Sequence, residues 1–353
     1  MEFQQPFEIL IHWALRLPFN DLLNLSATCR HFNEVIGQND LFWRLKFEDR
    51  FKLKDSSDRP WREKYRTYGR LHIYNSQGTA HQLLLSLSGT PIRAKQVSGM
   101  LFLNFEGQVW SANPLLSTNY QLVHSQIQKI CTTASTEYLL TQSGEVLYRG
   151  IDVNTREKIE DWKRIKFPIK LVDIAAGIDH LIGLDVNGKI WGWGQNTFQH
   201  LGENDEALTI PVQVTDFTAK KIIAGDYISA FITLNDELWI GGISRSGEIG
   251  PRLVQGFYYV HTKVKDVGFT SQDMFILTLD NNFKQLGNTK FTVKNNNRFL
   301  PNRHNYSIFF DSEFVVLVDN MGKIHYSKGI NMTKQVLAMQ ITRYQETFII
   351  LEQ

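Results

Sequence analysis

The feature that most constrains the fold of this chain is a short strand pattern that recurs along most of its length. Each copy has an apolar strand, a small or polar turn, a second apolar strand, a two-residue turn that often ends in glycine, and a third strand. Such a unit cannot bury its apolar faces alone, so neighbouring copies must pack on one another. The clearest copies begin at Val172, Lys221 and Lys265, weaker ones at Ile127 and Tyr306, and a fragment at Gln96.

The spacing of the copies predicts a seven-bladed β-propeller. Equivalent turns lie 37 to 48 residues apart, which suits one four-stranded blade per copy. The C-terminal segment 340–353 supplies two strands of a further copy, and segment 69–74 has the sequence of its missing third strand. We expect these two segments to pair, because pairing closes the ring and removes open sheet edges. The predicted turns are centred near Gly107, Gly144, Gly188, Asp236, Phe283 and Gly322.

The best-preserved corner of the repeat is the segment Ile190–Gly202, which reads IWGWGQNTFQHLG. Its glycines suit tight turns and close backbone approaches, its tryptophans suit packing between blades, and Asn196 suits a turn that its side chain stabilises. A phosphate-binding loop would instead need a lysine and a following helix, and neither follows this segment. We therefore interpret the segment as part of the repeat.

This corner and the Gly-x-x-His turn before it resemble the repeat of the regulator of chromosome condensation family. The motif match covers residues 172–219, and the other copies keep the strand rhythm without the motif. The resemblance implies a propeller over residues 69–353. We expect His180 to hydrogen-bond within its blade rather than to bind a metal. The matching residues are Gly177, His180, Trp193, Gly194, Asn196, Leu201 and Gly202.

Residues 1–47 follow a different, helical pattern. A first apolar run ends at Pro18, a second ends at Gly37, and a third begins at Asn39 or Asp40. About forty residues rarely bury enough area to be stable alone, so this module is expected to use a partner surface. The charge-rich segment 48–68 is predicted to be a helical linker.

The helical module carries a proline and an acidic residue before paired apolar residues, then leucines after a turn, then a cysteine, a basic residue and an aromatic residue, and finally a leucine and a tryptophan. These residues are Pro6, Glu8, Ile9, Leu10, Leu22, Leu23, Leu25, Cys29, Arg30, Phe32, Leu41 and Trp43. In this pattern the module resembles the F-box family, and the resemblance implies three helices that dock on the Skp adaptor, and through it on the cullin, of a ubiquitin ligase. The residues expected to bind the adaptor are Pro6, Ile9, Leu10, Leu17, Leu22, Leu23, Leu25, Cys29 and Phe32.

Composition and motifs exclude several classes of function. A net charge of +2 is too small to favour nucleic acid or an anionic membrane as the main partner. No apolar run is long enough for a membrane helix, and the N-terminus does not read as a secretory signal. The two cysteines suit a reducing compartment, so we expect a cytoplasmic or nuclear protein. Catalytic and metal-binding motifs are absent from the sequence, so we expect no enzyme activity, cofactor or metal.

One group of residues is a candidate site for a protein substrate. The turn between the first two strands of each copy should lie at one rim of the propeller, and six of the seven turns carry an acid. A ring of carboxylates would attract a basic segment of a partner, although acids also suit solvated turns for backbone reasons alone. The candidate residues are Glu137, Asp179, Asp226, Asp273, Glu313 and Glu346, with Tyr227 and Tyr344 as aromatic neighbours.

The leading hypothesis is a non-catalytic substrate receptor of a Skp-cullin-F-box ubiquitin ligase. The helical module would dock on the adaptor, and the propeller would hold the protein to be ubiquitinated. A second hypothesis is a guanine-nucleotide exchange factor that acts on a small GTPase through the propeller. A third is a chromatin-associated module, which the modest net charge disfavours.

Overall fold

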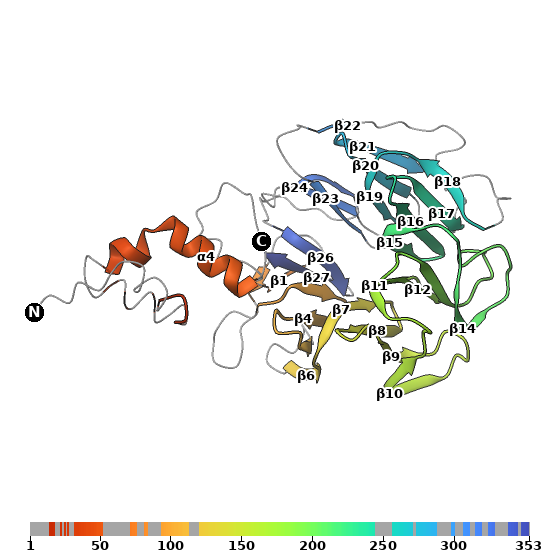
Figure 1. The fold of residues 1–353 in the computed structure, drawn as a ribbon, viewed down its shortest axis with the longest axis horizontal. Helices are drawn as coiled ribbons and strands as arrows, with labels where there is room; N and C mark the ends of the chain where they lie inside the picture. The colour runs from red at the N-terminus through yellow and green to blue at the C-terminus, as the bar shows by residue number, and fades with distance from the viewer. Residues whose placement is uncertain are drawn as a thin grey trace, which may run out of the picture. The chain divides into compact units, whose positions relative to one another are not determined.

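The structure is a computed structural model that divides into two compact units, Met1–Gly69 with Gln353, and Arg70–Glu352 (Figure 1). Each unit has its own interior. The described residues are 14–17, 22, 25, 27, 32–51, 71–75, 81–83, 93–112, 120–243, 256–270, 273–287, 298–300, 306–310, 315–319, 324–328, 338–344 and 347–352.

The described helices of the first unit are a π-helical turn, η1 (Asn33–Gly37), and α4 (Asp40–Phe51). The side-chain Oδ1 of Asn39 accepts a hydrogen bond from the backbone N–H of Phe42 at 3.0 Å, which caps the first turn of α4. The predicted start of this helix is therefore confirmed. The predicted boundary between residues 47 and 48 falls inside α4, because the helix continues to Phe51.

The interior of the first unit includes a buried lysine as well as apolar side chains. Lys46 is 7% exposed, and its Nζ donates to the carbonyl oxygens of Leu15 and Leu17, the latter at 2.7 Å. These bonds tie α4 to the segment that precedes it by about thirty residues. Within the described residues, no helix is both long and apolar enough to cross a membrane. The buried apolar side chains are Ala14, Leu22, Ile36, Phe42 and Trp43.

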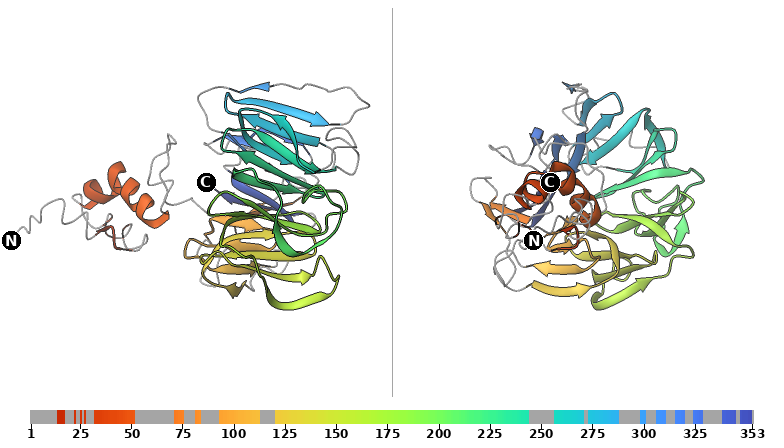
Figure 2. Two further views of the ribbon diagram at one scale, coloured as in Figure 1. Left: turned by 45° about the vertical axis from the view of Figure 1, so that its right-hand side comes forward. Right: turned by 60° about the vertical axis from the view of Figure 1, so that its left-hand side comes forward.

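Residues 70–352 form seven antiparallel sheets, so the predicted mainly β class is confirmed (Figures 1 and 2). Six sheets have four described strands and one has three. The first three sheets in chain order are β3 (Gln96–Ser98), β4 (Leu101–Leu103), β5 (Val109–Ala112) and β6 (Tyr120–His124); β7 (Ile127–Thr132), β8 (Thr136–Thr141), β9 (Val146–Ile151) and β10 (Lys158–Ile165); and β11 (Leu171–Ala176), β12 (His180–Asp185), β13 (Ile190–Gly194) and β14 (Leu208–Gln213).

The next three sheets continue the same order of strands along the chain. They are β15 (Ala219–Gly225), β16 (Ile228–Thr233), β17 (Leu238–Gly242) and β18 (Tyr258–His261); β19 (Val264–Phe269), β20 (Asp273–Thr278), β21 (Asn282–Gly287) and β22 (Arg298–Phe299); and β23 (Tyr306–Phe310), β24 (Val315–Asp319) and β25 (Ile324–Lys328).

The seventh sheet joins the two ends of the repeat region. It consists of β2 (His81–Leu83), β1 (Leu71–Asn75), β27 (Thr347–Glu352) and β26 (Ala338–Tyr344), in that spatial order. Strand β1 pairs antiparallel with β27, with Leu71 opposite Leu351 and Asn75 opposite Thr347. The pairing expected between the two end segments is therefore present. Each described sheet is open, and none closes on itself as a barrel.

The sheets follow one another around the unit in chain order (Figure 2, right). The first strand of each sheet contacts the first strand of the next, from β3 through β7, β11, β15, β19 and β23 to β26. Strand β26 in turn contacts β3. Because a sheet therefore lies against each face of its neighbours, the second strands are covered on both sides, and every residue of β12, β16 and β20 is buried.

A backbone hydrogen bond links each of four sheets to the next. The turn between the second and third strands has a residue with positive φ, whose carbonyl oxygen accepts the N–H of the first residue in the following sheet. Glycine reaches this conformation without strain, and aspartate or asparagine tolerates it. The links are Ile127 to Gly107 (2.8 Å), Leu171 to Gly144 (3.0 Å), Ala219 to Gly188 (2.8 Å) and Val264 to Asp236 (2.8 Å).

One predicted turn position is wrong by two residues. The turn in the β19–β22 sheet was expected near Phe283, but the residue with positive φ is Asn281, at 58°. The hydroxyl of Thr278 accepts the N–H of Asn282 at 3.0 Å and fixes the turn there. Phe283 instead lies in β21 and is 1% exposed, because its ring packs in the interior between sheets.

A second repeated glycine is the last or next-to-last residue of the third strand in three sheets. Gly150, Gly194 and Gly242 have φ values of 112°, 114° and 100°. A Cβ at these positions would lie 2.2, 2.6 and 2.1 Å from the carbonyl oxygens of Ser135, Asp179 and Tyr227. The absence of a side chain therefore lets the third strand approach the turn between the first two.

We predict that Gly242→Ala destabilises the protein more than Gly202→Ala. Both glycines have positive φ, but a Cβ at Gly202 meets no atom closer than 3.8 Å, whereas at Gly242 it meets a carbonyl oxygen. Backbone strain should cost about 1–3 kcal/mol in both variants, and the forced displacement at Gly242 should add about 1–3 kcal/mol. Thermal unfolding of the full chain measures the difference. Equal melting temperatures would show that the close approach does not matter.

Candidate functional site

The predicted acidic residues lie at or near the turns between the first and second strands. Asp179 precedes β12, Asp226 lies between β15 and β16, Asp273 begins β20, and Glu137 lies in β8. Neighbouring turns touch, since the N–H of Ile178 donates to the carbonyl oxygen of Asp226 at 3.0 Å. Two of these side chains therefore come from turns that are side by side, as the repeat predicts.

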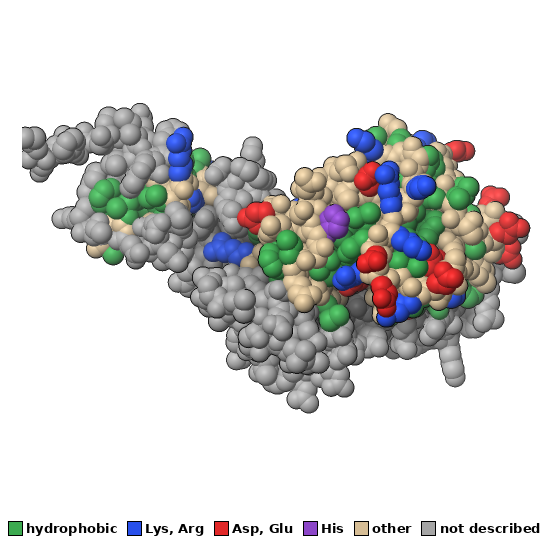
Figure 3. All heavy atoms as spheres, turned by 90° about the horizontal axis from the view of Figure 1, so that it is seen from below, with side chains coloured by type: hydrophobic (Ala, Val, Ile, Leu, Met, Phe, Trp, Pro, Cys, Tyr) green, Lys and Arg blue, Asp and Glu red, His purple; other side chains and the backbone are tan. Residues whose placement is uncertain are grey.

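The structure does not present these residues as a ring of exposed carboxylates. Asp179 and Asp273 are 8% and 7% exposed. Glu137 accepts a hydrogen bond from Arg149 Nε at 2.6 Å, and the guanidinium of Arg149 stacks on Trp162. Asp226 is half-buried. Basic and acidic side chains are interspersed on the face of the repeat unit seen in Figure 3.

Of the remaining predicted positions, Tyr344 is described and is the last residue of β26. Glu313 and Glu346 lie outside the described residues. Their part in a binding site stays a prediction.

An aromatic pair next to Asp226 was only half predicted from the sequence. The rings of Tyr227 and Phe198 meet edge to face, with centroids 5.0 Å apart, and both residues are half-buried. Phe198 belongs to the loop between β13 and β14 and so reaches the turn of the next sheet. The sequence feature that could have identified Phe198 is the presence of an aromatic residue in the otherwise polar stretch QNTFQH. Half-exposed aromatic side chains beside a carboxylate suit recognition of a protein segment.

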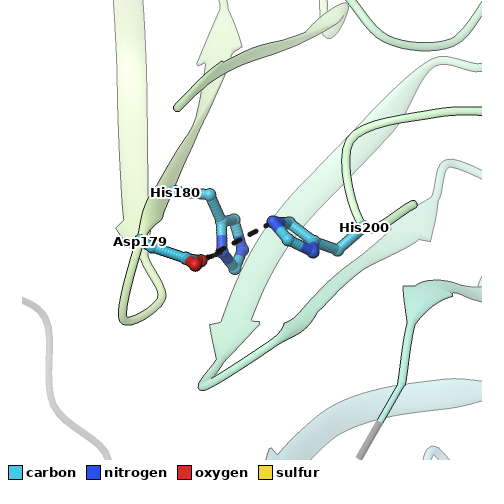
Figure 4. A group of neighbouring side chains, drawn as sticks. All are labelled: Asp179, His180 and His200. Atoms are coloured by element: carbon cyan, nitrogen blue, oxygen red, sulfur yellow. Dashed lines mark ion pairs between the residues drawn. The ribbon is translucent and has the colours of Figure 1, made fainter. Parts of the chain in front are cut away.

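The same junction contains a compact group of two imidazoles and a carboxylate (Figure 4). Oδ1 of Asp179 lies 3.7 Å from Nδ1 of His180 and 3.8 Å from Nε2 of His200. The two rings lie against each other with centroids 4.1 Å apart. Among the described residues, this is the one group of three or more His, Cys, Asp or Glu side chains placed to hold a metal ion.

This group is buried without hydrogen bonds of normal geometry among the described residues. His180 and His200 are 0% exposed, and none of their four ring nitrogens has a hydrogen bond of normal geometry, although the ring of His200 has a weak polar contact with the backbone of Gln195. The expectation that His180 hydrogen-bonds within its blade is therefore wrong, because its ring turns toward His200. Burial, together with the neighbouring His180, lowers the pKa of His200 to about 2, although the backbone of Gln195 opposes the shift.

The preserved corner of the repeat positions His200. Oδ1 of Asn196 accepts the N–H of Leu201 at 2.6 Å, and Nδ2 of Asn196 donates to Oδ1 of Asn204 at 3.1 Å. The predicted turn-stabilising role of Asn196 is thus confirmed. These bonds hold the β13–β14 loop so that His200 points toward the turn that carries His180.

Ion pairs connect the first strands of neighbouring sheets. Nζ of Lys129 on β7 contacts Oδ1 of Asp173 on β11, and Nζ of Lys221 on β15 contacts Oδ1 of Asp266 on β19 at 2.7 Å. In each of these four strands the pairing register shifts immediately before the charged residue, as expected for a β-bulge. The bulge therefore brings an acid or a base to the same place in four successive sheets.

The predicted adaptor-binding residues are only partly described. Leu22 is fully buried and belongs to the interior of its unit, while Leu17, Leu25 and Phe32 are half-buried. Pro6, Ile9, Leu10, Leu23 and Cys29 lie outside the described residues.

The structure adds two exposed leucines to this predicted surface. Leu41 and Leu45 on α4 are 60% and 38% exposed. They lie one turn apart on the same face of the helix, so together they form an apolar stripe.

Two family matches agree with the resemblances seen in the sequence. An F-box-like domain matches residues 6–48, and the regulator of chromosome condensation (RCC1) repeat matches residues 171–199 and 187–232. The chain therefore combines an F-box-like domain with RCC1 repeats, and the matches indicate no catalytic enzyme family. Desolvation raises the pKa of the Cys131 thiol, which is half-buried, to about 11.

Similar proteins support the fold of the repeat region. The RCC1 domain-containing protein RUG3, mitochondrial, of Arabidopsis thaliana is 25% identical over 146 residues, which cover 38% of this chain and 32% of that protein. The match therefore spans about a third of that protein's length.

Solved structures resemble a larger share of the chain. The crystal structure of Kap60 bound to yeast RCC1 (Prp20) matches with a TM-score of 0.64 at 14% identity, over 82% of this chain and 90% of that one. Human WBSCR16 matches with a TM-score of 0.59 at 12% identity, over 80% and 98%. Prp20p of Saccharomyces cerevisiae matches with a TM-score of 0.55 at 13% identity, over 82% and 93%. At these identities the likeness is one of fold.

We predict that Lys129 and Asp173 are energetically coupled across the two sheets. A double-mutant cycle of Lys129→Met and Asp173→Asn should give a coupling of about 0.5–1 kcal/mol in chemical unfolding. Asparagine keeps an acceptor for the N–H of Ile174, which donates to Asp173 at 2.8 Å. The matched control is Lys158 and Glu160, whose side chains are 72% and 78% exposed and which should show no measurable coupling. Zero coupling for both pairs would contradict a role in joining the sheets.

Proposed function

We propose that this chain is the substrate-recognition subunit of a Skp-cullin-F-box ubiquitin ligase. The observation that carries the proposal is the presence, on one chain, of an F-box-like domain and RCC1 repeats, with no catalytic enzyme family among the matches. F-box domains generally dock on Skp adaptors, and RCC1-like folds bind proteins. Such a subunit needs no chemistry of its own, because holding a target near the transfer enzyme raises its effective concentration.

In this proposal the seven sheets are the blades of a closed propeller over residues 69–353. The ring of contacts between first strands and the pairing of β1 with β27 support closure. The F-box module would comprise three helices within residues 1–47, with residues 48–68 as the connection to the propeller. Both parts would work in the cytoplasm, the nucleus or both.

The adaptor surface is proposed to include an apolar stripe on α4. Leu41 and Leu45 are exposed apolar side chains on a helix whose opposite side, with Phe42 and Trp43, fills the interior of the unit. An exposed apolar helix face suits docking against helices of a partner. The predicted contacts from Pro6, Ile9, Leu10, Leu17, Leu23, Leu25, Cys29 and Phe32 would complete this surface, whereas Leu22, which is fully buried, would support it from the interior.

We predict that Leu41→Glu and Leu45→Glu each weaken adaptor binding at least about tenfold, because a buried charge would replace an apolar contact. Calorimetric titration of the full chain with the purified Skp adaptor of the same organism measures this. The control is Arg44→Ala, an exposed position on the same helix, which should bind as the wild type does. If the wild-type chain fails to bind the adaptor, the proposed function is wrong.

The target surface is proposed to lie around Phe198, Asp226 and Tyr227, where two sheets meet. A carboxylate beside two half-exposed rings suits a basic or aromatic segment of a target protein. The buried carboxylates Asp179 and Asp273, and Glu137 with its arginine partner, would contribute less than the sequence predicts.

We predict that Tyr227→Ala removes the target from a trapped complex. The double variant Leu41→Glu and Leu45→Glu should retain its targets, because it no longer delivers them for ubiquitination. Quantitative mass spectrometry would compare proteins captured by this variant with and without Tyr227→Ala. The control is Tyr259→Ala, on β18, where the side chain is 49% exposed. Identical captured proteins in all three samples would contradict a target surface at this junction.

A second candidate function is nucleotide exchange on a small GTPase. The structure of Prp20p, which is similar in fold, is described together with its binding to Gsp1p and histones. The alternative proposal is that the RCC1-like region of this chain binds partners of that kind. Release of fluorescent GDP from a panel of small GTPases separates the two functions. Release accelerated by the full chain, without adaptor binding, would favour exchange.

A further inference from the structure

We propose that Asp179, His180 and His200 bind a divalent transition-metal ion of the zinc class. The site would lie where the β11–β14 sheet meets the β15–β18 sheet (Figure 4). It is independent of the proposed ligase function, because it rests on the geometry of three side chains alone.

The three candidate donor atoms lie close enough together to share one ion. The three candidate ligand atoms lie within 4.8 Å of one another, and Oδ1 of Asp179 is 3.7 and 3.8 Å from the nearest nitrogens of His180 and His200. Tetrahedral zinc with bonds of about 2.0–2.1 Å places its ligand atoms about 3.3 Å apart. The two distances from Asp179 would have to shorten by about 0.4–0.5 Å, and a pair of donor atoms 4.8 Å apart by about 1.5 Å, so coordination requires rotation of the imidazole side chains as well as small shifts.

Buried polar atoms of the two histidines and of Asp179 lack normal hydrogen bonds. Oδ1 of Asp179 and all four ring nitrogens of the two histidines are buried without a hydrogen bond of normal geometry among the described residues, and only the ring of His200 has a weak polar contact, with the backbone of Gln195. Buried polar atoms almost always have a partner, so five such atoms in one place require an explanation. A cation would satisfy three of them at once, and it would offset the cost of burying the carboxylate.

The chemical type of the donor atoms favours a transition metal. Two imidazole nitrogens and one carboxylate oxygen suit zinc and its neighbours among the transition metals, whereas calcium and magnesium prefer oxygen. A divalent ion with one carboxylate would keep a net charge of +1. The side chain of Asp179 is 12% exposed, so water can reach the fourth position from that side.

Glycines from two sheets leave the space that the site needs. A Cβ at Gly177 would lie 2.5 Å from both Nδ1 of His180 and the carbonyl oxygen of Gly225. A Cβ at Gly242 would lie 2.8 Å from Cβ of His200. The ion would therefore fasten the β13–β14 loop to the turn between β11 and β12, at the junction where the proposed target surface lies.

The test uses the full chain, purified without a histidine tag. Elemental analysis after dialysis against zinc sulfate and then metal-free buffer should find one zinc ion per chain. Cobalt added to chelator-stripped protein should give the intense visible bands of tetrahedral coordination. Less than about a tenth of an equivalent of zinc, and a cobalt spectrum like that of the free aqueous ion, would overturn the proposal.

Variants connect the ion to these residues. Asp179→Asn and His200→Gln should each weaken zinc binding at least about 100-fold in competition with a chromophoric chelator, since even residues outside the ligand set change affinity by about 10–100-fold. The control is His325→Gln, which removes a second histidine–carboxylate contact, with Asp319 at 2.6 Å, and should bind zinc as the wild type does. Unchanged affinity in both ligand variants would overturn the proposal. If either variant fails to fold, the cobalt spectrum of the wild type still decides.

Discussion

The arrangement of the repeat unit depends on one repeated backbone hydrogen bond. A turn residue with positive φ offers its carbonyl oxygen to the first N–H of the following sheet, as Gly188 does to Ala219 at 2.8 Å. Because the bond recurs at the same place in four junctions, the five sheets that it joins, from β3 to β22, lie against one another in the same order. Stacked sheets cover both faces of their second strands, and this explains why strands such as β16 are buried at every residue.

The same stacking brings the candidate binding residues together where two sheets meet. Where the β11–β14 sheet meets the β15–β18 sheet, the turns between their first two strands touch through the bond from Ile178 to Asp226, and the β13–β14 loop brings Phe198 to Tyr227. Within one such junction, glycines that end or adjoin strands make room for large side chains. The result is a place with half-buried aromatic rings outside and two buried imidazoles inside.

The two units divide the proposed work between them. In the first, Lys46 and the buried aromatic side chains fix α4 from inside, which leaves Leu41 and Leu45 on its outer face. In the second, ion pairs such as Lys221 with Asp266 join first strands across sheets, so the surface turns are held on a connected framework. A rigid binding face and an exposed docking helix are what a receptor subunit requires.

The sequence by itself determined the repeat, the mainly β class, the pairing of the end segments and the start of a helix at Asn39 or Asp40, because periodicity and turn chemistry are local. It misplaced the Phe283 turn by two residues, since asparagine and glycine can both supply the positive φ. Only the tertiary structure decided the state of the acidic residues. Glu137 meets Arg149 across a strand pair, and Asp179 is covered by two histidines. Burial and partner choice depend on which distant residues a sheet brings together, and no local pattern encodes them.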